Sequence, residues 1–353
     1  MKRLGGLWPQ ITSFENLYIA YLKARRGKKR AYEIARFALN LESELLALQA
    51  QLLAGTYQPG AYRLFSIYER KPRQIAAAPF RDRVVHHALL NIIEPAIDRQ
   101  FIHDSYACRK GKGVHAAVNR YQNWAKRYTY VLKMDVSRYF PSIDHELLKC
   151  KLRKKIKDRR VQRLLDLVVD CSPEYDEHPV WFCGDDLMTP FERRLGIPIG
   201  NLTSQFFANL YLDEMDHYIK ESLNIKAYMR YVDDLFILHD DKGYLKSLQT
   251  SIADKLMQER LLLHPRKANI MPTRYGVDVL GYRVFPDYRQ IRNDNGHRFG
   301  RKLRQFAKAY AQGKIKIADC NASVQSWIGH AQHGDTLGLR KKMFNQTVFI
   351  RHT

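Results

Sequence analysis

The sequence predicts a mixed α/β (α+β) fold, with an antiparallel sheet and its helices lying between two helical regions. Apolar residues recur at helical spacing over 13–54. From 61 to 290, short β-prone runs alternate with helical patterns, and beyond 290 the pattern is helical and basic. We therefore expect a helical extension over 1–60, a mixed region over 61–290 and a basic helical region over 291–353.

The first region is expected to contain two helices. They would lie between Ser13 and Ala54, separated by the basic stretch around Gly27. The segment Gly55-Thr-Tyr-Gln-Pro-Gly60 has the composition of a turn. It marks the predicted boundary with the mixed region.

Acidic residues stand at the ends of two β-prone runs in the mixed region. Tyr130-Val-Leu-Lys-Met-Asp135 alternates in polarity and ends in an acid. Residues 227–239 form two apolar runs with Asp233 and Asp234 between them, which predicts a β-hairpin with both acids at its turn. Asp144 is expected to cap a helix that continues to about Leu152.

Adjacent aspartates at the turn of an apolar hairpin are costly unless a cation neutralises them. Taken alone, Asp233-Asp234 also fits a solvated turn, and Asp135 also fits a strand-end acid in a loop. If the three acids converge, they would hold two metal ions ~4 Å apart, an arrangement that supports in-line phosphoryl transfer. Carboxylate oxygens suit Mg²⁺, which fills the rest of its shell with waters and substrate phosphates.

The charge of the chain indicates a polyanionic partner. The 353 residues include 59 Lys and Arg against 36 Asp and Glu, a formal net charge of +23. Basic residues cluster at 23–30 and 151–157, and residues 291–353 carry twelve Lys or Arg against three acids. Each cluster alone also fits a solvated helix face. The overall surplus predicts nucleic-acid binding that weakens steeply with salt. Residues 170–194, by contrast, are rich in Pro, Gly and acids and are expected to form an excursion.

Cysteine usage and hydropathy favour the cytoplasm. The five cysteines, at 108, 150, 171, 183 and 320, show no paired spacing for zinc. The amino terminus lacks a signal-peptide core. No apolar run approaches the ~20 residues that a transmembrane helix needs. We therefore expect no membrane partner.

Two motifs carry a resemblance to a known family. Leu132-Lys-Met-Asp-Val-Ser-Arg-Tyr-Phe-Pro-Ser-Ile-Asp144 and Tyr231-Val-Asp-Asp234 resemble the metal-binding motifs of reverse transcriptases. Further segments match in the family's order over about 60–285: 62–84, 105–113, 195–205, 263–267 and 279–284. The resemblance implies a right-hand polymerase with fingers and palm over 61–290 and a helical thumb over 291–353.

The segment Ile197-Pro-Ile-Gly-Asn-Leu-Thr-Ser-Gln205 resembles reverse transcriptases of diversity-generating retroelements. Intron-encoded and retroviral enzymes usually carry glutamine where this chain has Ile199. The resemblance implies error-prone, adenine-directed copying of a template-repeat RNA. Two alternatives stay open: another bacterial reverse transcriptase (group II intron-derived, retron or phage-defence), and a non-catalytic RNA-binding scaffold.

The resemblance also implies metal ligands. Asp135 and Asp233 would bind two Mg²⁺ ions, with Mn²⁺ as an alternative. Asp234 would assist electrostatically, and the carbonyl of Val136 would supply a further oxygen.

Substrate contacts are implied in the same way. Phe140 would exclude the ribose 2′-hydroxyl, although it also fits simple packing under the palm. Arg73, or alternatively Lys71, would contact the incoming triphosphate. Ile199 would lie near the nucleotide sugar, or it merely fills space, and Gln205 closes the same motif. Lys267 would donate a proton to pyrophosphate, although a surface lysine is equally compatible.

The partners implied are template RNA, the RNA/DNA duplex, deoxynucleoside triphosphates and a small basic accessory protein that forms an oligomeric helical bundle. Two basic proteins repel each other unless RNA bridges them or one carries a patch built for the contact. The sequence does not locate that patch.

Overall fold

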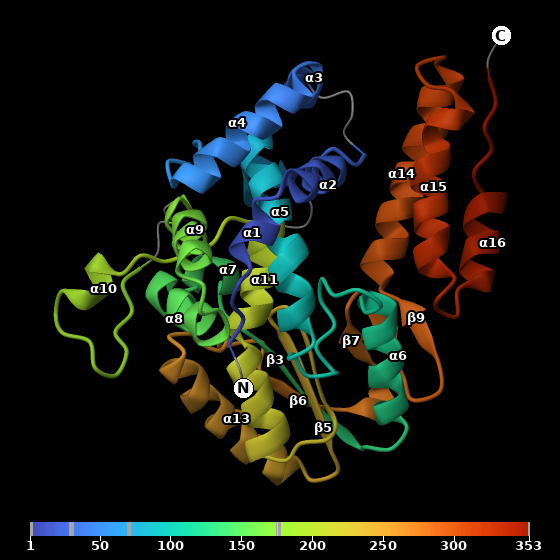
Figure 1. Cartoon of the computed structure of the whole chain (residues 1–353). Helices are drawn as coiled ribbons and strands as arrows, with labels where there is room; N and C mark the ends of the chain where they lie inside the picture. Colours follow the sequence, from blue (N-terminus) through green and yellow to red (C-terminus); the bar gives the residue numbers. More distant parts are fainter. Residues whose placement is uncertain (1–2, 28–31, 69–71, 174, 176–177, 352–353) are drawn as a thin grey trace.

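The structure is a computed structural model that describes residues 3–27, 32–68, 72–173, 175 and 178–351. Its three antiparallel sheets and surrounding helices confirm the mixed α/β class (Figure 1). Within 62–84, one of the segments that carry the family resemblance, Arg63–Tyr68 (β1) and Pro72–Ala77 (β2) form an antiparallel hairpin. The division of the chain at residues 60 and 290 stays a prediction.

The N-terminal region contains more helices than expected. They are Trp8–Ile11 (α1), Phe14–Ala24 (α2), Tyr32–Leu39 (α3) and Leu41–Ala54 (α4). The expected two helices over 13–54 are therefore wrong, because a break at Asn40 divides the second. Asn40 has φ −119° and ψ 39°, outside the helical region. The apolar spacing continues across this break, so the pattern alone could not show it.

The central sheet has the strand order β4-β5-β3-β6. Its strands are Tyr130–Asp135 (β3), Tyr228–Tyr231 (β4), Asp234–His239 (β5) and Asn269–Pro272 (β6). The predicted strand and hairpin are thus confirmed. Because side chains alternate across a strand, Leu132 and Met134 enter one core while Val131 enters the other.

Helices build the larger core around this sheet. They are Phe80–Asp98 (α5), Tyr139–Ser142 (α7), His145–Lys155 (α8), Arg159–Asp170 (α9), Leu202–Tyr211 (α11), Asp213–His217 (α12) and Lys242–Gln258 (α13). A π-helical turn follows at Tyr218–Ser222. The side chain of Asp144 accepts a hydrogen bond from Leu147 N at 2.9 Å. This contact confirms the predicted cap of α8.

A second core joins the sheet to the C-terminal helices. It contains Val114–Ala125 (α6), the sheet β7-β8-β9 (Val277–Val279, Tyr282–Val284 and Arg289–Ile291), Asn293–Ala311 (α14) and Ile317–Ala331 (α15). A 3-10 turn lies at Thr273–Tyr275, and Leu337–Asn345 (α16) ends the helical region. Trp327 stacks on Phe299 with ring centroids 4.1 Å apart, so its ring belongs to this core.

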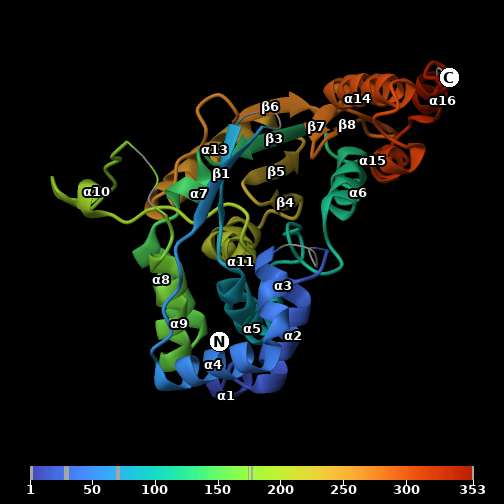
Figure 2. The same cartoon turned by 90° about the horizontal axis from the view of Figure 1, so that it is seen from above.

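Two views show how these parts are arranged. The N-terminal helices pack against α5, and α14–α16 stand on the opposite side from Thr189–Glu192 (α10) and its loop (Figures 1 and 2). No helix in the described part of the chain is both long and apolar enough to span a bilayer.

Candidate active site

The three predicted carboxylates meet at one end of the central sheet. Asp135 ends β3 and Asp234 begins β5, and the two are direct register partners. Asp233 lies in the β4–β5 turn, where Val232 adopts a positive φ of 55°. The backbone amide of Val136 donates to Asp233 O at 3.1 Å. The structure therefore brings Asp135, Asp233, Asp234 and the main chain of Val136 together.

A buried ion pair between Arg230 and Asp216 supports the β4–β5 hairpin. Arg230 and Asp216 are completely buried, with Arg230 Nη2 2.6 Å and Nε 2.8 Å from the two carboxylate oxygens. Arg230 Nη1 also donates to Val232 O at 3.1 Å, directly before Asp233. No prediction made from the sequence paired these two residues. The only sign of the pair in the sequence was Arg230, a basic residue within an otherwise apolar strand.

Burial and mutual repulsion define the electrostatics of the acids. Burial, followed by the charges of Asp234 and Asp135, raises the pKa of Asp233 from 3.8 to about 6. The pKa of Asp234 is also raised, by burial first and then by Asp135, while Lys133 and Lys267 oppose the shift. The site therefore carries unfavourable negative charge, which a bound cation would relieve.

Lys267 reaches this site from the segment after α13. Its Nζ donates to Oδ2 of Asp135 at 2.7 Å, although half of its side chain is exposed. His264 N donates to the backbone oxygen of Asp135 at 2.8 Å, which fixes the segment beside β3. Of the substrate-binding residues predicted, Lys267 is therefore placed directly at the carboxylates.

The donor set suits a hard cation. In the described residues, no three His, Cys, Asp or Glu side chains form a group that could hold a metal ion. Mg²⁺ does not need such a closed cage, because it commonly takes one or two carboxylates and completes its shell with waters and phosphates. One or two of the carboxylates of Asp135, Asp233 and Asp234 would suffice for that mode of binding.

The loop before α11 connects the segment around Phe140 to strand β2. Phe140 O accepts from Ile197 N at 3.0 Å, and Ile199 O accepts from Ala76 N of β2 at 3.2 Å. Asn201 Nδ2 donates to Ala76 O at 3.0 Å. The side chains of Phe140 and Ile199 are both half-buried. The loop therefore holds Phe140 and Ile199 in one backbone network with the β1–β2 hairpin.

The other predicted residues lie apart from the carboxylates. Arg73 is exposed on β2, and Gln205 is exposed on α11 between buried neighbours. Within the described residues, no hydrogen bond or ion pair joins either side chain to the three acids. Lys71 lies outside the described residues.

A hollow of about 650 Å³ lies between Tyr68, at the end of β1, and the C-terminal helices. Its lining includes Tyr68 of β1 and Arg298, Lys302, Ser323 and Ser326 of α14 and α15. Cationic and hydroxyl groups of this kind suit a phosphate backbone.

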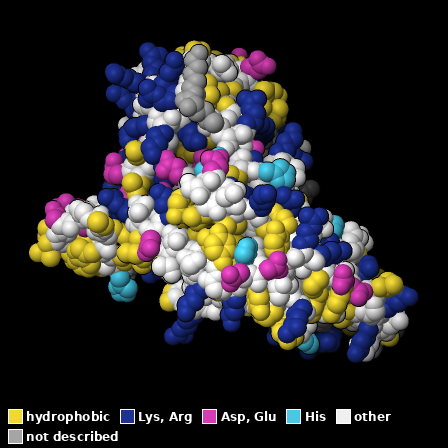
Figure 3. All heavy atoms as spheres, turned by 90° about the horizontal axis from the view of Figure 1, so that it is seen from below, with side chains coloured by type: hydrophobic (Ala, Val, Ile, Leu, Met, Phe, Trp, Pro, Cys, Tyr) yellow, Lys and Arg dark blue, Asp and Glu magenta, His cyan; other side chains and the backbone are white. Residues whose placement is uncertain are grey.

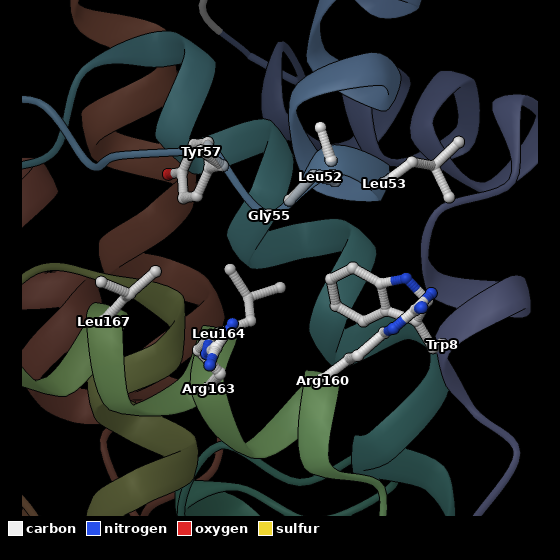
Figure 4. Close-up of a pocket in the computed structure, with 10 residues that line it drawn as sticks. Trp8, Leu52, Leu53, Gly55, Tyr57, Arg160, Arg163, Leu164 and Leu167 are labelled. Carbon is white, nitrogen blue, oxygen red and sulfur yellow. The ribbon is translucent and has the colours of Figure 1, made fainter.

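A cavity of about 230 Å³ lies elsewhere, between the N-terminal helices and α9 (Figure 4). It is lined by Trp8, Leu52, Tyr57, Arg160 and Arg163 together with Leu53, Ala54, Gly55, Leu164 and Leu167. None of the predicted site residues lines it.

Comparison with known proteins agrees with this geometry. Residues 66–284 match the family model described as reverse transcriptase (RNA-dependent DNA polymerase). Protein YkfC of Escherichia coli K12 is 29% identical over 188 residues, 51% of this chain and 46% of that protein. The group II intron-encoded protein LtrA of Lactococcus lactis is 21% identical over 240 residues, 66% of this chain and 38% of that protein.

The nuclear intron maturase 1, mitochondrial, of Arabidopsis thaliana is 33% identical over 87 residues, 25% of this chain and 12% of the maturase. The matched regions span less than half the length of each of these three relatives. The family model nevertheless covers more than half of this chain and includes all three carboxylates. The chain therefore belongs to the reverse transcriptase family.

Proposed function

We propose that this protein is an RNA-directed DNA polymerase that extends a primer by two-metal phosphoryl transfer. The observation that carries the proposal is the register pairing of Asp135 with Asp234, which places two distant motifs at one end of the sheet. Membership of the reverse transcriptase family supports it.

Asp135, Asp233 and Asp234 would hold two Mg²⁺ ions, or alternatively Mn²⁺, with the carbonyl of Val136 as a further ligand. The bound ions supply charge stabilisation at the attacking 3′-oxygen and the departing pyrophosphate. Arg230 keeps the turn in place through Val232, so the carboxylates need little reorganisation when substrate arrives. Lys267 holds its ammonium at Asp135, where it can pass a proton to the leaving group.

The remaining predicted residues would select the nucleotide. Phe140 would exclude a ribose 2′-hydroxyl and so favour deoxynucleotides. Arg73, with Lys71 as the alternative, would bind triphosphate oxygens. Gln205 is exposed on α11, next to the loop that carries Ile199, and would face the template or the nucleotide.

The template RNA and the RNA/DNA duplex would lie along the basic C-terminal helices. Arg298 and Lys302 line the same hollow as Tyr68 of β1, and the net charge of the chain is +23. Counterion release then predicts an affinity for duplex that falls steeply as salt rises. The free cysteines among the described residues suit the reducing cytoplasm that we propose as the location.

We further propose that the enzyme serves a diversity-generating retroelement, together with a small basic accessory protein. Ile199 supports this role, because a hydrocarbon side chain replaces the usual glutamine beside the nucleotide sugar. Losing one polar contact there removes about 1 kcal/mol of discrimination, which favours misincorporation at template adenines. The alternative, an intron-type role, is favoured by the likeness to LtrA and to the intron maturase.

Copying a defined RNA with and without its native flanks, and sequencing the product, tests the role. The retroelement role predicts errors concentrated at template adenines, which Ile199→Gln reduces and the matched control Ile199→Val does not. Unchanged adenine errors in Ile199→Gln would remove the structural support for this role.

A further inference from the structure

The excursion before the nucleotide loop ends in exposed apolar side chains. Trp181, Leu187, Met188 and Phe191 are 48%, 76%, 55% and 63% exposed, respectively. We call these four residues the apolar tip. Large apolar side chains gathered on one projection are unfavourable in water, and such patches commonly mark interaction sites.

Ordered contacts hold the apolar tip in shape. The side chain of Arg193 is only 4% exposed; it pairs with Asp144 at 3.2 Å and with Asp185 at 2.5 Å. Arg193 also donates to Val180 O at 3.0 Å. Trp181 and Phe191 meet edge to face at 5.8 Å. The tip is therefore presented on a fixed scaffold, which lowers the entropic cost of binding a partner.

Asp186 completes this scaffold at the start of α10. Its Oδ1 accepts hydrogen bonds from the amides of Met188 and Thr189 at 3.0 and 2.7 Å. The neighbouring Leu187 and Met188 are thereby directed outward, where they are exposed. Their exposure follows from the local fold of the loop.

The charge of the excursion is opposite to that of the rest of the chain. Residues 170–194 contain seven Asp or Glu against two Arg, whereas the whole chain carries a net +23. Asp186 and Glu192 are exposed beside the apolar tip. An acidic rim around an apolar centre repels nucleic acid and attracts a basic surface.

The apolar tip lies away from the C-terminal helices, along which we propose that the duplex binds. The α10 loop projects on the side of the molecule opposite α14–α16 (Figures 1 and 2). In the space-filling view, hydrophobic atoms with an acidic group beside them form the left-hand projection, while Lys and Arg are spread over other parts (Figure 3). A partner on the tip would not compete with a duplex lying along the C-terminal helices.

We propose that the apolar tip with its acidic rim is a docking surface for a protein that presents an apolar patch bordered by Lys and Arg. The contact would bury Leu187, Met188 and Phe191 and pair the partner's cations with Asp186 and Glu192. This inference concerns a protein contact and does not depend on the proposed retroelement role.

A labelled peptide tests the proposal with the full chain. The probe is a synthetic basic amphipathic helix of two Leu-Lys-Lys-Leu-Leu-Lys-Leu repeats, and the comparison peptide has Glu at every Lys. Fluorescence anisotropy should show that Leu187→Ser/Met188→Ser/Phe191→Ser weakens binding of the basic peptide by about tenfold or more. The acidic peptide should not bind.

Two control variants separate the tip from general effects. Leu39→Ser/Leu46→Ser/Leu53→Ser removes three leucines of the N-terminal helices that are 83%, 48% and 52% exposed, and the peptide affinity should stay unchanged. Asp186→Asn/Glu192→Gln retains the cap and removes the rim charge, so its affinity should fall at low salt and match wild type at high salt. Thermal unfolding verifies that each variant is folded.

Several results would overturn the proposal. Equal peptide affinity for wild type and the tip variant would do so, as would equal binding of the acidic peptide. Loss of single-stranded RNA binding in the tip variant would assign the tip to nucleic acid instead. Wild-type dimers that disappear in the tip variant during light-scattering measurements would assign it to self-association.

Discussion

Lys267 Nζ donates a hydrogen bond to Oδ2 of Asp135 at 2.7 Å, which joins two motifs that are distant in the chain. Asp135 is the register partner of Asp234. The ammonium of Lys267 therefore lies beside a group of carboxylates that repel one another. Its charge also lowers the pKa of Asp233 and of Asp234, against the stronger effect of burial. The lysine therefore stabilises the ionised site before any substrate binds.

Replacing Lys267 should change both the rate and its pH dependence. Lys267→Met removes the proton donor, so the single-turnover extension rate should fall about a hundredfold. The acidic limb of the pH–rate profile should move to higher pH, because Asp233 and Asp234 lose a neighbouring cation. In the matched control Lys267→Arg, the acidic limb should stay at its wild-type pH because the positive charge is kept. Its extension rate should still be low. If Lys267→Met leaves the extension rate and the pH–rate profile unchanged, Lys267 is only a surface residue.

Neutralising Asp233 should stabilise the protein. The pKa of Asp233 is raised in the folded state, so the folded protein binds the proton more tightly than the unfolded chain does. The stability linked to this proton is present below about pH 4 and is lost as pH rises toward 6. Asp233→Asn should therefore gain about 1–3 kcal/mol near neutral pH without metal, and little near pH 4.

Urea unfolding at both pH values measures this difference. Asp254→Asn, on an exposed position of α13, is the matched control and should change stability little. Added Mg²⁺ should raise the unfolding temperature of the native chain more than that of Asp233→Asn. If Asp233→Asn is less stable than wild type near neutral pH, the site does not carry the repulsion described.

The buried pair of Arg230 and Asp216 should be a large contributor to the stability of the hairpin. Arg230→Met leaves a carboxylate buried without its partner, which should cost about 3–5 kcal/mol in urea unfolding. The double variant Asp216→Asn/Arg230→Met should recover part of that loss, because no uncompensated charge remains. A loss below about 1 kcal/mol in Arg230→Met would contradict this account.

Phe140 should set the preference for deoxynucleotides. Phe140→Val opens space beside the sugar, so incorporation of ribonucleotides relative to deoxynucleotides should rise about tenfold or more. Phe140→Tyr keeps the bulk of the ring and should retain the wild-type ratio. Single-nucleotide extension with each substrate measures the ratio, and an unchanged value in Phe140→Val would show that the ring only packs.

Much of the site followed from local patterns in the sequence. Alternation over Tyr130–Asp135 and two apolar runs around Asp233-Asp234 predicted the strands. A strand buried on one face alternates between apolar and polar residues, and a strand buried on both faces is a short apolar run. The pairing of the Tyr130–Asp135 strand with the hairpin around Asp233-Asp234 was expected only through the family resemblance. Local patterns do not encode which strands are neighbours.

Other features depended on tertiary contacts that the sequence does not display. The partners of Arg230 lie on α11 and α12 and in its own hairpin, so no local pattern paired it with Asp216. The position of the α10 loop depends on the ion pair between Arg193 and Asp144, which lie far apart in the chain. The helix break at Asn40 was hidden by apolar spacing that continues across it.

Primer extension by the native chain and by Asp233→Asn, on an annealed RNA template with Mg²⁺, tests the central claim most directly. The native chain should extend the DNA primer, and Asp233→Asn, although folded and more stable, should be slower by at least about a hundredfold. Equal extension by the two proteins, or no extension by the native chain, would contradict the assignment of these carboxylates to catalysis.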